Sequence, residues 1–204
     1  MFKFSPHVLF AASLTVATVQ SLSAQEGASG EVFGGYTYIK ASPLVAAPKT
    51  SMHGWMGGAG AYVNRWFGVG MEIAAQFGEI PPPSGVSAPN LSSKEYSYLV
   101  GPQFRFLKTD RVQVAAKFLL GGVFGQVRVD PTTSAAAAAQ LSAAGYSSFD
   151  QTKFGMLLGF PVDVGVSKLI GIRIQPGLYM TDFSNTKQGN FRFTVGPVFR
   201  FGGK

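Results

Sequence analysis

From about residue 30 onward, the sequence alternates between bulky apolar residues and small or polar residues with a period of two. In the last of these runs, Phe191, Phe193 and Val195 share one face. Arg192 and Thr194 share the opposite face. Successive side chains of a β-strand point to opposite sides, so this period predicts strands whose two faces meet different surroundings. Eight such runs follow one another, and the sequence therefore predicts an all-β fold of eight strands.

The links between the eight runs alternate between short and long. The runs cover about residues 30–41, 51–63, 67–77, 95–106, 112–121, 154–165, 170–181 and 191–201. Short links lie at 64–66, 107–111 and 167–169, and the other links, most of them longer, lie at 42–50, 80–93, 130–150 and 184–189. Short turns at one end and long loops at the other are typical of transmembrane β-barrels. We therefore expect an eight-stranded antiparallel up-and-down transmembrane β-barrel.

The composition indicates which face of the strands points outward. Charged residues make up only 13% of the chain, whereas the surface of a soluble domain needs roughly 25–35%. The interior of an eight-stranded barrel is also only just filled by side chains. We therefore expect bulky apolar side chains to contact lipid, and Gly, Ala, Ser and a few long polar groups to fill the lumen. The alternative is a periplasmic lipid-binding barrel, whose apolar face would line an inner cup.

Residues 1–24 have the three-part layout of a secretory signal peptide. Lys3 precedes the apolar stretch 8–19, and small residues at 21–24 offer a cleavage site. As a helix, about twelve apolar residues span roughly 18 Å, which is shorter than the roughly 30 Å hydrocarbon core of a bilayer. We therefore expect export and cleavage, which leaves residues 25–204 as one barrel domain.

Aromatic residues gather near both ends of the runs. Two aromatic girdles separated by aliphatic residues match the two interfaces between lipid and water. The expected interface residues are Tyr36, Tyr38, Trp55, Trp66, Phe67, Tyr96, Tyr98, Phe104, Phe106, Phe199 and Phe201. Phe33 is expected in the girdle at the short-link end.

Charged residues also occur on the face that should line the lumen. They are Glu72, Glu95, Arg105, Lys117, Asp163, Arg173, Arg192 and Arg200. Charges inside a narrow barrel must pair, because an unpaired buried charge is very costly. We favour a network of salt bridges that plugs the lumen, since eight strands leave little room for a channel. The alternative is a small-solute porin with an arginine-lined pore.

Four prolines interrupt the predicted strands: Pro102, Pro161, Pro176 and Pro197. A proline cannot donate a hydrogen bond to a neighbouring strand, so each proline is expected to lie at a β-bulge.

Several of these features together resemble a known family. They are the signal peptide, the opening strand Gly34-Gly35-Tyr36-Thr37-Tyr38 and the two Gly-Pro-x-Phe-Arg-Phe segments at 101–106 and 196–201. The chain resembles small bacterial outer-membrane β-barrel proteins, such as the transmembrane domain of outer-membrane protein A and its single-domain relatives. The resemblance implies an outer-membrane location, reached through the periplasm and the outer-membrane assembly machinery, in contact with lipid and lipopolysaccharide.

Other chemistry finds little support in the sequence. His53 is the one histidine beyond the signal peptide, and a lone histidine beside Ser51 without a placed acid does not indicate an enzyme. The chain contains no cysteine, and we expect no metal or cofactor site. The net charge is +7, but the basic residues are scattered, so we expect no nucleic-acid partner.

An alanine-rich stretch at 135–144 predicts a short helix within a long loop. We expect a structural or surface-interaction role, with no surface ligand identified.

Overall fold

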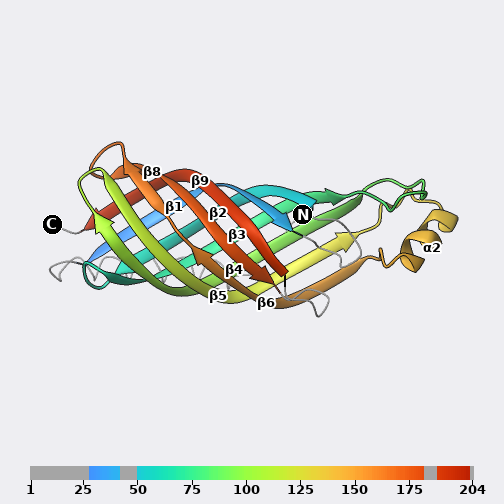
Figure 1. Ribbon diagram of the computed structural model, residues 1–204, viewed down its shortest axis with the longest axis horizontal. Helices are drawn as coiled ribbons and strands as arrows, with labels where there is room; N and C mark the ends of the chain where they lie inside the picture. The colour runs from blue at the N-terminus through green and yellow to red at the C-terminus, as the bar shows by residue number, and fades with distance from the viewer. Residues whose placement is uncertain (1–27, 42–49, 182–187, 203–204) are drawn as a thin grey trace, which may run out of the picture.

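The computed structural model describes residues 28–41, 50–181 and 188–202 of the chain. The predicted signal peptide and most of the predicted links 42–50 and 184–189 lie outside this part. Figure 1 shows tilted strands that form a closed wall, with a short helix beyond one end. The elements are β1 (Ser29–Ala41), β2 (Thr50–Tyr62), β3 (Phe67–Ile80), β4 (Leu91–Lys108), β5 (Val112–Arg128), α2 (Ala135–Ala143), β6 (Phe149–Gly159), β7 (Val162–Gly165), β8 (Ile170–Thr181) and β9 (Gln188–Gly202).

The strands form one closed antiparallel ring. Each strand pairs with its neighbour along the chain, and β9 pairs with β1. Segments β6 and β7 belong to a single barrel strand, because they hold the same register against β8. Gly159 lies opposite Gly177, and Val162, three residues later, lies opposite Ile174, three residues earlier. The predicted eight-stranded up-and-down barrel is therefore confirmed.

Three short turns define one end of the barrel, which we call the turn end; the opposite end, near α2, is the loop end. Each turn is closed by a polar side chain at its start. Asn64 accepts hydrogen bonds from the backbone N–H groups of Trp66 and Phe67 at 2.8 and 2.7 Å. Thr109 and Ser167 likewise accept from backbone N–H groups at the start of β5 and β8. Such local bonds supply the turn chemistry that lets adjacent strands reverse within a few residues.

The two faces of the strands have the surroundings that the alternation predicts. In β9, Phe191 and Phe199 are about half exposed on the outside, at 50% and 49%, whereas Arg192 and Thr194 are buried. In β8, Ile172 is exposed and Arg173 is buried. Bulky apolar side chains therefore cover the outer wall, a surface far more apolar than a soluble domain presents.

The prolines are accommodated differently from the prediction. The expectation of a β-bulge is wrong at all four positions, Pro102, Pro161, Pro176 and Pro197, since the strand registers before and after each are the same. The pairing is interrupted locally instead. Pro102 pairs with Val69 of β3, but the described ladder to β5 skips it. A proline lacks the backbone N–H donor, so one hydrogen bond to a neighbouring strand is lost, but no extra residue is inserted as in a β-bulge. A register shift does occur between Arg105 and Leu107.

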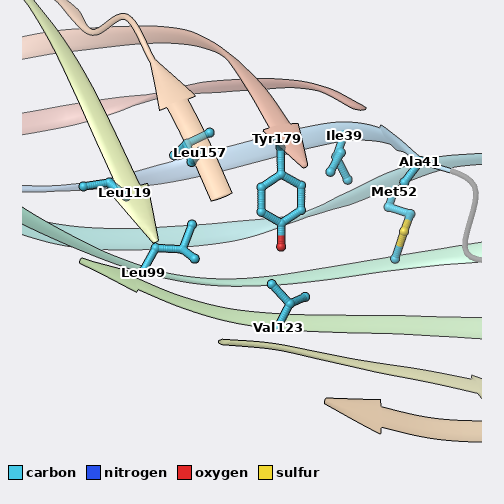
Figure 2. Packing of buried hydrophobic residues seen from close by; sticks show 8 residues of the cluster. All are labelled: Ile39, Ala41, Met52, Leu99, Leu119, Val123, Leu157 and Tyr179. Carbon is cyan, nitrogen blue, oxygen red and sulfur yellow. The ribbon is translucent and has the colours of Figure 1, made fainter. Parts of the chain in front are cut away.

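The lumen contains large apolar side chains as well as polar ones. The expectation that its apolar part consists of Gly and Ala is therefore wrong. Figure 2 shows the largest such group, the midlumen cluster, which consists of Ile39, Ala41, Met52, Leu99, Leu119, Val123, Leu157 and Tyr179. A barrel of this size is packed to near-native density by its interior side chains, so these residues do the same work as the core of a soluble domain.

The loop end carries a second apolar cluster, which includes the predicted helix. Helix α2 is confirmed over Ala135–Ala143, with Ser134 as its N-cap. Its Leu141 packs with Tyr146 against Ile80, Leu91 and Val127 at the ends of three strands. Among the described residues, no helix has the length and apolarity needed to cross a membrane.

Candidate functional site

The first group of lumen charges is centred on Glu72 of β3. Lys117 Nζ lies 3.0 Å from Glu72 Oε1, and Arg192 Nη2 lies 2.5 Å from Oε2. Gln175 donates a further hydrogen bond to Oε1 at 2.9 Å. All four side chains lie on inward positions of their strands and are at most 2% exposed. One carboxylate is thus shared by two cations and an amide, which satisfies a buried charge from several sides.

The second group is centred on Arg173 of β8. Its guanidinium binds Asp163 of β7 through two hydrogen bonds, at 2.7 and 2.8 Å. The same guanidinium lies 2.9 Å from Glu31 Oε1 of β1. Gln113 donates to the other oxygen of Glu31 at 3.2 Å. Arg200 adds a looser contact with Asp163 at 3.7 Å. The fork of a guanidinium suits this two-sided binding of carboxylates.

Phe33 lies between the two groups. Lys117 Nζ and the guanidinium carbon of Arg173 are each 4.2 Å from the centre of its ring, which is within cation–π range. The placement of Phe33 in the outer girdle is therefore wrong, because its side chain is only 4% exposed and points into the lumen. Gly58 makes room for the ring, since a Cβ atom there would lie 2.4 Å from its tip.

Three of these contacts cross the whole barrel. In a ring of eight strands, β3 and β8 are separated by four steps in either direction, and so are β1 and β5. The Gln175–Glu72 and Gln113–Glu31 hydrogen bonds therefore join opposite walls. The Lys117–Phe33 contact also joins β5 to β1.

The structure brings together six of the eight charged residues predicted for the lumen. Glu72, Lys117 and Arg192 form one group, and Asp163, Arg173 and Arg200 form the other. Glu95 and Arg105 are also buried, but neither forms an ion pair within the described residues. Arg105 instead stacks on Tyr62, 3.5 Å from its ring centre, and donates to Ser29 at 3.2 Å.

Glu31 was missed by sequence reasoning. It lies two residues before Phe33 on the inward face of β1, and glycines at 30, 34 and 35 obscure the alternation of that strand. The period of two could have identified Glu31, because Glu31 lies an even number of residues before Thr37 and therefore on the same inward face.

Ten of the eleven predicted interface aromatics occupy outward positions of their strands, and Trp66 lies in the turn before β3. Nine of them are exposed, between 36% and 61%: Tyr36, Trp55, Trp66, Phe67, Tyr96, Tyr98, Phe104, Phe106 and Phe199. Tyr38 and Phe201 are partly covered. Near the turn end, Phe67 and Phe104 pack with ring centres 5.3 Å apart.

His53 has partners that do not suit catalysis. Its Nδ1 forms a hydrogen bond with the hydroxyl of Tyr36, and Ser51 pairs with Tyr38 at 3.0 Å. His53 and Ser51 are therefore each engaged with a tyrosine on the outer wall. Activation of a serine requires a histidine within hydrogen-bond reach, and these contacts do not supply one.

The closed ring, its apolar outer wall and its packed lumen define the class of structure, which is that of small outer-membrane β-barrels. Three solved structures share it. Ail, the attachment invasion locus protein of Yersinia pestis, is 16% identical, covers 87% of this chain and 100% of its own, and gives a TM-score of 0.54. Neisserial surface protein A is 14% identical over 86% of this chain and 96% of its own, with a TM-score of 0.56. OprG of Pseudomonas aeruginosa is 13% identical, covers 89% of this chain and 99% of its own, and gives a TM-score of 0.53.

These likenesses confirm the predicted resemblance at the level of fold. No protein-family model matches the sequence, and a search of curated proteins finds no match.

Proposed function

We propose that this chain is an integral outer-membrane protein whose lumen is plugged by the two charged groups and whose work is structural or surface interaction. The observation that carries the plug is the pair of hydrogen bonds between opposite walls, Gln175–Glu72 and Gln113–Glu31. A side chain that bridges the full width of an eight-stranded barrel occupies the space that a channel would need. The midlumen cluster fills a further stretch of the same lumen.

The outer wall supports the location. Exposed aliphatic residues run along its middle, and aromatic residues lie toward both ends, as in barrels that span a bilayer. We propose lipid and lipopolysaccharide as the surroundings, with insertion by the outer-membrane assembly machinery. A surface-interaction role would depend on the loop end, where the Leu141–Tyr146 cluster holds α2 against the strands. Ail, which shares this fold, is named the attachment invasion locus protein.

The location is tested by washing membranes that contain the expressed protein with alkaline carbonate and with high salt. An integral barrel stays with the membranes in both washes. Release by either wash would favour the alternative of a periplasmic lipid-binding barrel.

The plug is tested by conductance across planar lipid bilayers. The wild-type protein is expected to give no stable openings, because its lumen is bridged. A Glu72→Ala, Arg173→Ala double variant should open transient conductance, whereas Glu79→Ala, which changes an exposed acid on the same strand as Glu72, should not. Stable wild-type openings that Arg105 or Arg173 substitution reshapes would overturn the plug in favour of the small-solute porin.

A further inference from the structure

The turn end of the barrel opens into a cavity of about 400 Å³. Its lining includes Ser29, Glu31, Arg105, Lys108, Lys168 and Arg200. Gln113 and Glu31 form part of it and also belong to the bridge across the lumen. The cavity is therefore a pocket with a closed floor. We call it the turn-end cavity.

Positive charge in this cavity exceeds the negative charge available to neutralise it. Glu31 is already paired with Arg173, and Asp163 is shared between Arg173 and Arg200. Arg105 forms no ion pair among the described residues, and Lys108 feels repulsion from both Arg105 and Arg200. Asp110, at the rim, is the remaining acid of the lining. Among the described residues, the basic side chains of this region outnumber the acidic ones by two, which leaves two positive charges uncompensated. They are Arg105, Lys108, Lys168, Arg173 and Arg200 against Glu31, Asp110 and Asp163.

The two arginines of the cavity also have hydrogen-bonding capacity to spare. Arg105 is only 4% exposed, yet its Nε has no acceptor within the part of the chain that the structure describes. The Nε and Nη2 atoms of Arg200 also lack a hydrogen-bond acceptor in residues 28–41, 50–181 and 188–202. Ser29 accepts a hydrogen bond from Arg105, which leaves its own hydroxyl hydrogen free to donate. Buried donors without acceptors are costly, so a ligand that accepts from them gains affinity.

We propose that the turn-end cavity is a binding site for a phosphate group, either free inorganic phosphate or the phosphate monoester of a small molecule. A phosphate carries close to two negative charges, which match the uncompensated charge. Its oxygens suit the fork of a guanidinium, and a serine hydroxyl adds a further donor. A volume of about 400 Å³ leaves room for a small group attached to the phosphate.

The site does not depend on the proposed function. The charge balance and the cavity follow from the turn end alone, whatever membrane the barrel occupies and whether or not its lumen conducts.

Isothermal titration calorimetry on the folded full-length protein tests the proposal. The protein is held in a maltoside detergent, which contributes no phosphate, and titrated separately with inorganic phosphate and with glycerol phosphate. Saturable binding of either ligand is expected, and which arm binds distinguishes the free anion from the ester. Arg200→Gln should weaken binding at least about tenfold, because it removes a charge-assisted hydrogen bond. Arg65→Gln removes a cation from an exposed turn at the same end, outside the cavity, and should leave binding unchanged.

A second variant keeps the test decisive if Arg200→Gln fails to fold. Lys108 and Lys168 are exposed, so the double variant Lys108→Gln, Lys168→Gln should fold normally and weaken binding by about three- to tenfold, with a smaller dependence on salt. Folding is checked by the heat-dependent gel mobility of the barrel. Absence of saturable binding in both arms would overturn the proposal. Binding by the double-lysine variant that equals that of Arg65→Gln would do the same.

Discussion

The lumen is filled in two different ways along its length. Toward the turn end, Arg173 and Lys117 pair with Glu31 and Glu72, and Gln113 and Gln175 reach the same two carboxylates from the opposite walls of the barrel. From the middle toward the loop end, aliphatic side chains such as Leu157 and Val123 pack against one another. Both arrangements occupy space inside the barrel, but they depend on different physics. The charged part depends on complete pairing, because a buried charge without its partner is destabilising. The apolar part depends on volume, because a missing side chain leaves a cavity.

The largest effect is expected in the charged part, from Glu72→Ala. This change leaves Lys117 and Arg192 buried without their shared carboxylate. The free energy of unfolding should fall by about 3–5 kcal/mol, as when one partner of a buried ion pair is removed. Urea unfolding in lipid vesicles, followed by gel mobility, measures the change. The matched control is Glu79→Ala, which removes an exposed acid of β3. An equal loss of stability in both variants would show that the buried ion pairs of Glu72 do not cause the loss.

A comparable but smaller loss is expected in the apolar part, from Leu157→Ala. Leu157 is fully buried in the midlumen cluster, and its truncation should cost about 2–4 kcal/mol through lost contacts and an unfilled cavity. The same unfolding measurement applies. The neighbouring Leu158 points to the outer wall, where lipid can fill the space, so Leu158→Ala should cost less. A greater loss at Leu158 would contradict the assignment of the two faces.

The packing inside the charged part is tested by Gly58→Ala. A Cβ at this position would press on the ring of Phe33, which Lys117 and Arg173 hold in place, and on the backbone oxygen of Met71. The expected loss of stability is about 1–3 kcal/mol from overpacking. Gly57→Ala meets only an ordinary contact at 3.9 Å and should be tolerated. If both substitutions were tolerated equally, Phe33 would not be tightly packed.

The smallest effect is expected from an ion pair outside the lumen. Arg128 and Asp150 are 2.5 Å apart, the same separation as Arg192 and Glu72, but they are 45% and 44% exposed. Solvent screens an exposed pair, so Arg128→Gln should leave the urea midpoint unchanged within error. Arg192→Gln should lower it clearly. Equal effects would mean that burial does not determine the strength of these pairs.

The sequence predicted the fold through its most regular feature, the alternation along each strand. That alternation placed Arg192 and Arg173 inside and Ile172 outside, because a strand has only two faces. It predicted poorly where glycines weaken the pattern. Phe33 and Glu31 lie in such a stretch, and their places became visible only when β8 and β5 supplied partners from elsewhere in the chain.

Two other features depend on information that a local pattern does not contain. The prolines lose a hydrogen bond without shifting the register, and whether a ladder bulges or merely opens is decided by the neighbouring strands. The pairing of Glu72 with Arg192, 120 residues later, likewise depends on the closure of the ring. Sequence reasoning identified which charges face inward, and the shear and closure of the barrel decide which of them meet.

The most direct test of the account uses two adjacent residues of β9. The chain has no cysteine, so Thr194→Cys and Val195→Cys each give one site for a nitroxide spin label. In lipid vesicles, the label at 195 should be strongly relaxed by oxygen, which dissolves in the acyl chains. The label at 194 should be protected both from oxygen and from a water-soluble nickel chelate, because it lies in a packed lumen. Strong relaxation of the label at 194 by the nickel chelate, or by oxygen as much as at 195, would contradict a lipid-facing outer wall around a plugged barrel.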